Sequence, residues 1–300
     1  RVSSRLSVAR DELGRMLRRA FEGAATTEVE RDDDGQLTAV TRGDQLQRYR
    51  FTQGDVSLDG PTPGQTTAYD ASGRLVQWDD RAHTYDAHGR LETRRGPEGT
   101  QTFAWRDDGR LAEVRDDEGQ IVSFRYDVLS RRVQKRVERM VDGVSTFVSE
   151  TRFLYDGGQL VREIETRARE AGDPVIVDRR YELDDDEVPQ FEGTRQGEQW
   201  RWRYIVSGDA GEPLALIEVA TGVRTDVERT AWGQPQDSPT PLGFLGQYYD
   251  AETDLWCNRF RYYDGRSGRY ISPDPKGLRG GPHPYAYANN APFDAVDPDG

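Results

Sequence analysis

The sequence predicts an all-β protein, because it repeats a turn motif, alternates residue types with a period of two, and is too polar for a compact solid core. Of its 300 residues, 34% are hydrophobic and 32% are charged, against roughly a quarter charged in ordinary soluble domains. Aromatic residues still make up 10% of the chain, which argues against disorder. A sheet that is wet on both faces, or a wall around a polar cavity, fits this balance.

The turn motif is clearest in residues 69–75 and 85–91, which both read Tyr-Asp-Ala-x-Gly-Arg-Leu. Residues 105–111 repeat it with Trp in the first position. In a tight turn, Asp accepts hydrogen bonds from nearby backbone N–H groups and Gly takes the positive-φ position. The aromatic residue before the turn and the Leu after it can pair across two strands. Each copy therefore predicts a β-hairpin.

Weaker copies extend the repeat over most of the chain. They lie at residues 11–16, 32–37, 126–133, 155–160 and 263–270. Between the turns the side chains alternate, as in residues 124–126 and 200–204, and this period of two is typical of strands. Residues 6–21 also fit the apolar face of a helix, but Gly14 and the repeat around it favour a hairpin there.

A different motif, Asp-Pro-x-Gly, occurs twice near the end of the chain. The copies are Asp274-Pro275-Lys276-Gly277 and Asp297-Pro298-Asp299-Gly300. Asp, Pro and Gly suit the first, second and fourth positions of a β-turn, so a single copy would be structural. Because only a hairpin-sized stretch of chain separates the copies, the fold can bring the carboxylates of Asp274 and Asp297 together.

These motifs resemble those of the RHS/YD-repeat family. The Tyr-Asp…Gly-Arg-Leu units are similar to YD repeats, and residues 243–300 are similar to the RHS-repeat-associated core domain. The departures are small: Gly265 stands where the family usually has Pro, and Trp256 and Cys257 stand where aromatic residues are usual. The resemblance implies a long antiparallel β-ribbon of hairpins that spirals into part of a hollow shell. Residues 1–242 would be wall and residues 243–300 the core segment, although copies of the repeat reach residue 270.

The resemblance further implies an aspartyl autoprotease with Asp274 and Asp297 as its catalytic pair, and Pro275, Gly277, Pro298 and Gly300 as turn support. Two carboxylates at hydrogen-bond distance share a proton, because both cannot easily ionise. One can then act as general base on water while the protonated partner polarises the scissile carbonyl. The scissile bond is expected at or just beyond Gly300. No metal or cofactor is expected.

The function that the resemblance implies is the shell of a bacterial polymorphic toxin, which encloses a C-terminal toxin and cuts it free inside. Expected partners are the covalently encoded toxin and either a secretion spike or adaptor, as in type VI secretion, or the B component of a Tc toxin. An immunity protein would bind the toxin rather than this chain. The alternative is a non-enzymatic YD-repeat protein of the cell surface, used for adhesion or carbohydrate binding.

The net charge and the apolar runs of the sequence argue against nucleic-acid-binding and membrane-spanning proteins. The net charge of −13, from 41 basic and 54 acidic residues, disfavours non-specific binding to nucleic acid or anionic membranes. No run approaches the ~20 apolar residues of a membrane span. The chain has no signal peptide and opens on Arg1 within an ongoing pattern. We therefore expect a fragment of a longer protein that is secreted or delivered to target cells, with its targeting information elsewhere.

Other chemistry-bearing residues favour structural roles. Cys257, the single cysteine, lies among aromatic residues and lacks a third group to form a nucleophilic site with His283. The three histidines have no metal-ligand spacing, and the acidic runs at 32–34 and 184–187 lack the pattern of a calcium loop. Four aromatic residues could form a platform on which carbohydrates or nucleic-acid bases stack, although packing along strand faces is the favoured interpretation. They are Trp200, Trp202, Tyr204 and Trp232.

Overall fold

A computed structural model describes residues 6–21, 26–32, 37–42, 45–52, 55–59, 67–281 and 283–300. It confirms the all-β prediction. The regular elements of these residues are β-strands apart from two short 3₁₀ helices, η1 (Gly277–Gly280) and η2 (Ala288–Asn290). Within the same residues, no helix is long and apolar enough to cross a membrane.

The first sheet has six antiparallel strands in chain order. They are β1 (Leu6–Arg10), β2 (Met16–Phe21), β3 (Thr27–Arg31), β4 (Leu37–Arg42), β5 (Gln45–Thr52) and β6 (Asp55–Asp59). The pairing of β1 with β2 confirms the hairpin over residues 6–21, and Gly14 takes the left-handed φ of +78° that its turn requires. The turn predicted at residues 32–37 lies mostly outside the described residues.

The second sheet has fifteen antiparallel strands, again in chain order. Its first seven strands are β7 (Thr67–Tyr69), β8 (Leu75–Trp78), β9 (Arg81–Tyr85), β10 (Leu91–Gly96), β11 (Gly99–Trp105), β12 (Leu111–Asp116) and β13 (Gln120–Tyr126). The others are β14 (Arg132–Val141), β15 (Val144–Asp156), β16 (Gln159–Arg167), β17 (Val175–Leu183), β18 (Pro189–Gln196), β19 (Trp200–Ser207), β20 (Pro213–Glu218) and β21 (Arg224–Asp226). The predicted ribbon of hairpins is therefore confirmed.

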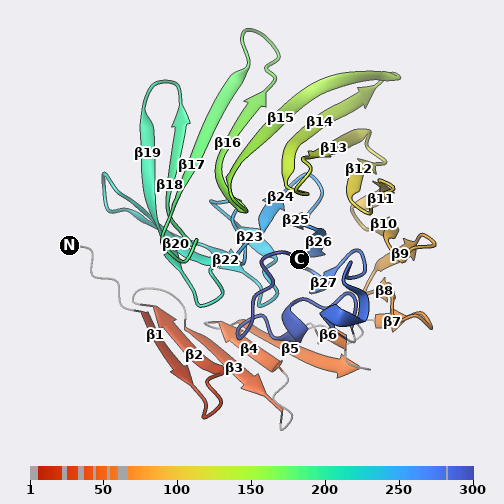
Figure 1. Ribbon diagram of the computed structural model, residues 1–300, viewed down its shortest axis with the longest axis vertical. Helices are drawn as coiled ribbons and strands as arrows, with labels where there is room; N and C mark the ends of the chain where they lie inside the picture. Colours follow the sequence, from red (N-terminus) through yellow and green to blue (C-terminus); the bar gives the residue numbers. More distant parts are fainter. Residues whose placement is uncertain are drawn as a thin grey trace.

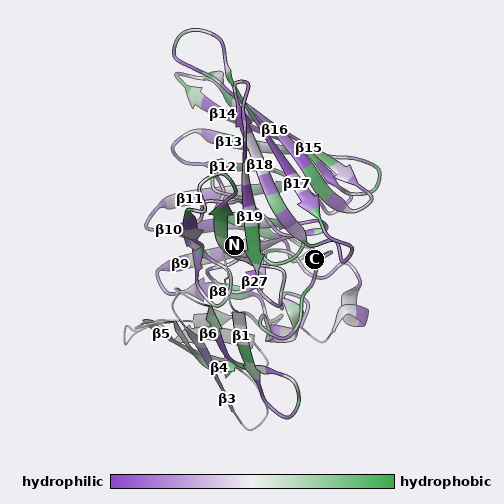
Figure 2. Ribbon diagram, turned by 90° about the vertical axis from the view of Figure 1, so that its left-hand side faces the viewer, coloured by the Kyte–Doolittle hydropathy of each residue, from purple (hydrophilic) through white to green (hydrophobic). Residues whose placement is uncertain are grey.

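Two small sheets follow the ribbon. They consist of β22 (Glu228–Arg229) with β23 (Pro235–Asp237), and of β24 (Tyr248–Asp250), β25 (Leu255–Asn258), β26 (Arg261–Asp264) and β27 (Arg269–Tyr270). Figure 1 shows the fifteen-stranded sheet curving around the four-stranded inner sheet, with the C-terminus near the centre. The last copy of the repeat, residues 263–270, lies in this inner sheet rather than in the large one. Figure 2 shows hydrophilic and hydrophobic residues interspersed along the long strands β14–β19.

The repeat motif works through side chains that link one turn to the next. In one copy, Asp86 Oδ1 accepts hydrogen bonds from the backbone of His88 and Arg90, and its Oδ2 accepts one from Arg90 Nε at 2.7 Å. The same guanidinium lies 5.6 Å from the ring centre of Trp105 and donates to the carbonyl of Arg106. Trp105 Nε1 in turn donates to the carbonyl of Leu91. The Asp shapes its own turn, while Arg and the aromatic residue join neighbouring turns.

The same ladder recurs along the row of turns. Arg74 packs over Tyr85, Arg110 over Tyr126 and Arg131 over Tyr155, with the guanidinium carbons 5.1 to 5.4 Å from the ring centres. The three tyrosine hydroxyls each donate to a backbone carbonyl of the preceding turn unit, as Trp105 does. Cation–π contacts of this kind are worth roughly 0.5–1 kcal/mol at partly exposed sites, so the row gains stability from many small contributions.

The inner sheet is fixed to the large sheet by buried polar contacts as well as by apolar packing. Arg132 of β14 is 2% exposed and forms an ion pair with Asp250 of β24, which is fully buried. The Arg132 guanidinium lies 4.6 Å from the ring centre of Phe153 and 5.2 Å from that of Tyr248. Lys135 adds a 3.1 Å ion pair to Asp250. Such a buried charge group holds one geometry, because separating its members leaves a charge unpaired away from water.

The core segment contacts the row of turns through residues that are far apart in the sequence. Arg269 Nη2 donates to the carbonyl of Gly73 at 3.1 Å, and the same guanidinium packs over Tyr69. Further along the row, Tyr285 OH donates to the carbonyl of Gly89 at 2.7 Å. The six-stranded sheet joins the same assembly, since Arg31 Nη2 lies 2.5 Å from Asp294 Oδ2. The end of the chain thus fastens both large sheets.

Candidate active site

The first Asp-Pro-x-Gly motif forms the predicted turn. Gly277 N–H donates to the carbonyl of Asp274 at 2.9 Å, and Lys276 N–H donates to Asp274 Oδ1 at 2.7 Å. Gly277 has a φ of +59°, which only glycine adopts at little cost. Gly280 of η1 lies against the carboxylate, since a Cβ there would overlap Asp274 Oδ2. The turn leaves the Asp274 side chain 13% exposed.

The second motif forms a similar turn. Gly300 N–H lies 3.3 Å from the carbonyl oxygen of Asp297 and 3.1 Å from its Oδ1. A Cβ on Gly300 would overlap the carbonyl oxygen of Asn258, so this turn sits directly on the loop between β25 and β26. The backbone of that loop also holds it, because Phe260 N–H donates to the carbonyl of Asp299 at 3.0 Å.

Arg261, the first residue of β26, brings the two motifs together. Its Nη2 lies 3.0 Å from Asp297 Oδ2 and 3.4 Å from Asp274 Oδ2. Its Nη1 donates to the carbonyl of Pro284, and its side chain is only 4% exposed. Both carboxylates therefore meet at one nitrogen atom of a buried guanidinium. The sequence led us to expect a shared proton between the two carboxyl groups, whereas the structure places a shared cation at that position.

Tyr270 and Asn258 hold the second carboxylate from the other side. Tyr270 OH donates to Asp297 Oδ2 at 2.8 Å, and Asn258 Nδ2 donates both to Tyr270 Oη and to the carbonyl of Asp297, each at 2.8 Å. The Arg261 guanidinium lies 3.6 Å from the centre of the Tyr270 ring. Burial raises the pKa of Tyr270 well above its usual range, and the nearby charge of Asp297 raises it further. Tyr270 is therefore a hydrogen-bond donor at any physiological pH.

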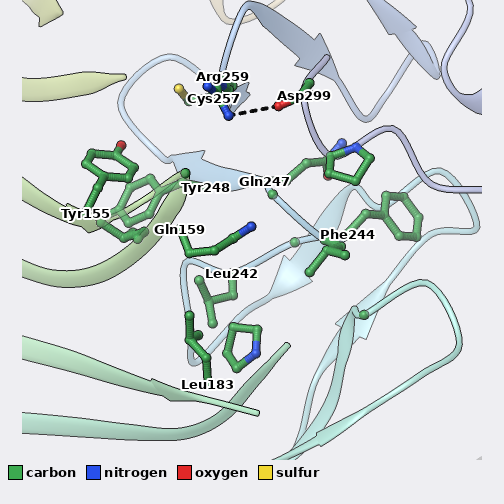
Figure 3. A pocket seen from close by; sticks show the side chains of 18 of the residues that line it. Tyr155, Gln159, Leu183, Leu242, Phe244, Gln247, Tyr248, Cys257, Arg259 and Asp299 are labelled. Carbon is green, nitrogen blue, oxygen red and sulfur yellow. Dashed lines mark hydrogen bonds and ion pairs between the residues drawn. The ribbon is translucent and has the colours of Figure 1, made fainter. Parts of the chain in front are cut away.

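Two cavities border the two motifs. A cavity of about 510 Å³ is lined by Arg261 and Asp274 from the core segment, and by His88, Arg90 and residues 107–110 from turns of the large sheet. A smaller, mainly apolar cavity of about 100 Å³ is lined by Pro298 and Asp299 together with strands β15–β19 and the loop at 242–248 (Figure 3). Each cavity therefore borders one of the two motifs.

The two predicted aspartates thus meet, but three residues of the cluster were missed by the sequence reasoning. Asn258 and Arg261 are cross-strand partners beside the β25–β26 turn, and Tyr270 is in β27. In sequence they lie within an aromatic-rich strand pattern, where each resembles an ordinary strand residue. The single available signal was Arg261, a charged residue in a segment that is otherwise typical of a buried strand.

The structure also places the residues for which the sequence favoured structural roles. Cys257 is buried, which raises the pKa of its thiol, and His283 is exposed. Trp232 is fully buried beside Met16, so it does not share a platform with Trp200 and its neighbours. Around Trp200, Arg180 and Arg195 pack on the ring at 4.6 and 5.1 Å. Among the described residues, no group of three or more His, Cys, Asp or Glu side chains is placed to hold a metal ion.

The ladder of hairpins and the inner sheet fixed within it define a class of protein: a repeat-built β-wall that carries its own C-terminal core segment. The chain belongs to the Teneurin YD-shell family, whose model matches residues 2–280. This confirms the RHS/YD-repeat resemblance of the sequence.

Two relatives of the chain are named as a probable deoxyribonuclease and a toxin. The chain is 34% identical over 267 residues to "Probable deoxyribonuclease RhsB" of Dickeya dadantii, covering 85% of this chain and 17% of that protein. It is 31% identical over 328 residues to "Toxin protein Tse5" of Pseudomonas aeruginosa, covering 96% of this chain and 24% of that protein. The chain therefore spans between a sixth and a quarter of the length of these relatives.

A solved structure confirms the fold. The crystal structure of TcdB2-TccC3 without its hypervariable C-terminal region superposes with a TM-score of 0.56 at 17% identity, covering 98% of this chain and 19% of that one. The chain is thus part of a YD-repeat shell of the kind that polymorphic toxins contain.

Proposed function

We propose that this chain forms the closing part of a toxin shell and cuts its own polypeptide just beyond Gly300, so that a C-terminal toxin is released inside the shell. The observation that carries the proposal is the meeting of Asp274 and Asp297 at Arg261 Nη2. Each of the two turns is closed by its own hydrogen bonds, so the turns alone do not require that both carboxylates meet one buried cation, which costs desolvation free energy.

In the reaction we propose, one carboxylate of the pair takes a proton from water, and the water oxygen bonds to the scissile carbonyl carbon. The other carboxyl group polarises the carbonyl oxygen and then gives its proton to the amide nitrogen as the C–N bond breaks. Arg261 and Tyr270 act by holding Asp297 Oδ2 in place. Because the substrate is the chain itself, the reaction is a single intramolecular event, and its rate gains from fixed proximity.

The shell would provide a separate advantage by keeping the cut toxin away from the producing cell. The partners we propose are the encoded toxin, a secretion spike or adaptor or the B component of a Tc toxin, and delivery into a target cell. An immunity protein would bind the toxin. The names of the relatives, which include a toxin and a probable deoxyribonuclease, support this class of cargo.

The test is to express the protein with its natural extension beyond Gly300 and look for two bands on a denaturing gel. Asp274→Asn and Asp297→Asn should each leave one uncut band. Asp299→Asn is the matched control, because its carboxylate pairs with Arg259 and is half exposed, so this variant should still cut. Complete cutting in both pair variants would show that the aspartates are not the catalytic pair.

A further inference from the structure

The contact between the large sheet and the inner sheet contains a buried histidine. His83 of β9 is 7% exposed, and its cross-strand partner is Arg94 of β10. Directly paired residues of antiparallel strands place their side chains on the same face of the sheet. Arg94 Nη2 donates to the carbonyl of Thr253 at 2.6 Å, and its Nη1 lies 3.5 Å from Asp264 Oδ2 of β26. His83 therefore lies on the face of the large sheet that the core segment covers.

The charges that face His83 come from four strands and are mostly positive. Arg81 of β9, Arg94 of β10 and Arg269 of β27 each repel a positive charge on the imidazole ring. Asp264 of β26 attracts such a charge, but its carboxylate already lies beside the Arg94 guanidinium. A protonated His83 would therefore be a fourth cation around one buried carboxylate.

Two further carboxylates at the edge of this contact also have arginine partners. Glu98 forms an ion pair with Arg81, and its side chain is 63% exposed. Asp254 forms an ion pair with Arg266. A charged His83 would compete with these arginines for the same carboxylates.

The imidazole ring of His83 also has an unpaired nitrogen. Its Nδ1 is buried and has no hydrogen-bond partner among the described residues. A neutral ring can keep this nitrogen as an unused acceptor, but a protonated ring has two N–H donors, and each needs an acceptor. A buried donor without an acceptor is costly, and more so when it is charged. Burial accordingly lowers the pKa of His83 to about 4, so the closed contact holds the ring neutral.

We propose that the contact around His83 is an acid-sensitive switch: when the ring takes a proton, β26 and β27 separate from β9 and β10, while the rest of the large sheet stays folded. Separation lets the charged ring reach water, which removes the cost of burying it. The signal would be a fall from neutral pH to about 5. The proposal does not use Asp274 or Asp297, so it does not rest on the proposed function.

The direction of the pH effect follows from the two states of the contact. In the closed state His83 has a pKa of about 4, whereas a separated His83 would have an ordinary pKa of about 6.5. Because the separated state binds the proton more readily, the closed state is disfavoured as pH falls through about 6.5 towards 4. From about pH 7.5 to about pH 5, the equilibrium constant for separation should rise about thirtyfold.

The first experiment measures hydrogen exchange of the backbone amides by mass spectrometry at about pH 7.5 and about pH 5. After correction for the intrinsic effect of pH on exchange, opening of β26–β27 and β9–β10 should increase by at least about tenfold. Strands β15–β18 should show no such increase. A smaller increase in β26–β27, or an equal increase in every strand, would overturn the proposal.

The histidines of the chain supply matched variants. The sequence contains three histidines; His83 is buried, whereas His88 and His283 are exposed. In His83→Gln the acid-induced opening of β26–β27 should disappear, because a carboxamide does not titrate. His283→Gln is the control and should retain the opening. Persistence of the opening in His83→Gln would assign the effect to another group and contradict the proposal.

A third measurement uses the wild-type protein, so it remains valid even if His83→Gln does not fold. The ring signals of the histidines are followed by NMR as the pH is lowered, and the signal of His83 is assigned by comparison with His88→Gln and His283→Gln. The His83 signal should change with the same midpoint as the hydrogen exchange of β26–β27. Protonation of His83 at a pH where these strands are still closed would show that its charge does not open the contact.

Discussion

Arginine–aspartate pairs occur in two regions of the molecule with different physical character. In the turns of the large sheet, Arg90 pairs with Asp86 four residues away at 2.7 Å, and both side chains stay partly exposed. Where the core segment meets the large sheet, Arg132 of β14 pairs with Asp250 across 118 residues, and both are buried. The first kind shapes a turn, whereas the second kind fixes the position of one sheet inside another.

The difference shows which interactions set local and which set global structure. Partly exposed pairs are worth about 0–1 kcal/mol each, so the turns rely on repetition. A buried pair contributes little on average when intact, but removal of one partner costs much more. The contact between the core segment and the large sheet should therefore be the region where a single substitution matters most.

Arg132→Met should give the largest effect. It leaves Asp250 with Lys135 as its remaining cation and removes a guanidinium that contacts several aromatic rings. We expect a loss of about 3–5 kcal/mol in the free energy of unfolding, measured by urea denaturation. Arg131→Met, at the neighbouring turn and about one-fifth exposed, is the control and should cost about 1 kcal/mol. Equal losses would erase the distinction between the two regions.

His83 should give the next largest effect, as a dependence of stability on pH. Burial lowers the pKa of His83 to about 4, against the attraction of nearby Asp264. The unfolded chain, with an ordinary pKa near 6.5, binds the proton more readily, so stability is lost as pH falls from about 6.5 towards 4. The loss should reach roughly 3 kcal/mol. In His83→Gln the slope in this range should be flatter, and an unchanged slope would assign it to another group.

Two glycines of the turn row separate the cost of a turn from the cost of docking. Gly89 and Gly109 both have φ near +80°, but a Cβ on Gly89 would lie 2.6 Å from the Tyr285 hydroxyl, whereas Gly109 faces open space. Gly109→Ala should cost about 1–2 kcal/mol for the left-handed backbone. Gly89→Ala should cost about 1 kcal/mol more, because it also displaces the hydrogen bond from Tyr285. Denaturation midpoints of the two variants give the difference directly.

Tyr270→Phe should slow self-cleavage by about tenfold, a change of about 1.4 kcal/mol in the activation free energy. A hydrogen bond to a charged group is worth about 1.5–3 kcal/mol, and Tyr270 supplies one to Asp297 Oδ2. The rate is read from gel bands over time. Tyr249→Phe is matched, because it removes a hydroxyl that donates to Asp254 in the same small sheet. A similar slowing in both variants would indicate loss of packing rather than a role for Tyr270.

The sequence predicted the large sheet well because its information is local. Each turn carries its own Asp, Gly and Arg, and a copy such as residues 85–91 is recognisable without knowledge of its neighbours. The ladder that joins successive turns, such as Arg90 over Trp105, was less visible, because the spacing between copies varies. The inner position of residues 263–270 was not predicted at all, since their motif is the same as that of the wall.

The candidate site was predicted in part. Asp274 and Asp297 stood out because their turn motifs are unusual when paired. The shared cation was missed, because Arg261 meets the carboxylates only through the fold and has no spacing that marks it.

The contact of Arg269 with Gly73 bears on the order of events during synthesis. Gly73 lies at the start of the fifteen-stranded sheet, and Arg269 lies in the core segment that follows this sheet in the sequence. The contact therefore cannot form until almost the whole described chain has left the ribosome. Contacts of such long sequence separation form late. In the reaction we propose, the catalytic cluster is assembled by the same segment, so the cut would report that the wall is finished. The docking of the last strand, β27, would then set the earliest time at which the chain can be cut.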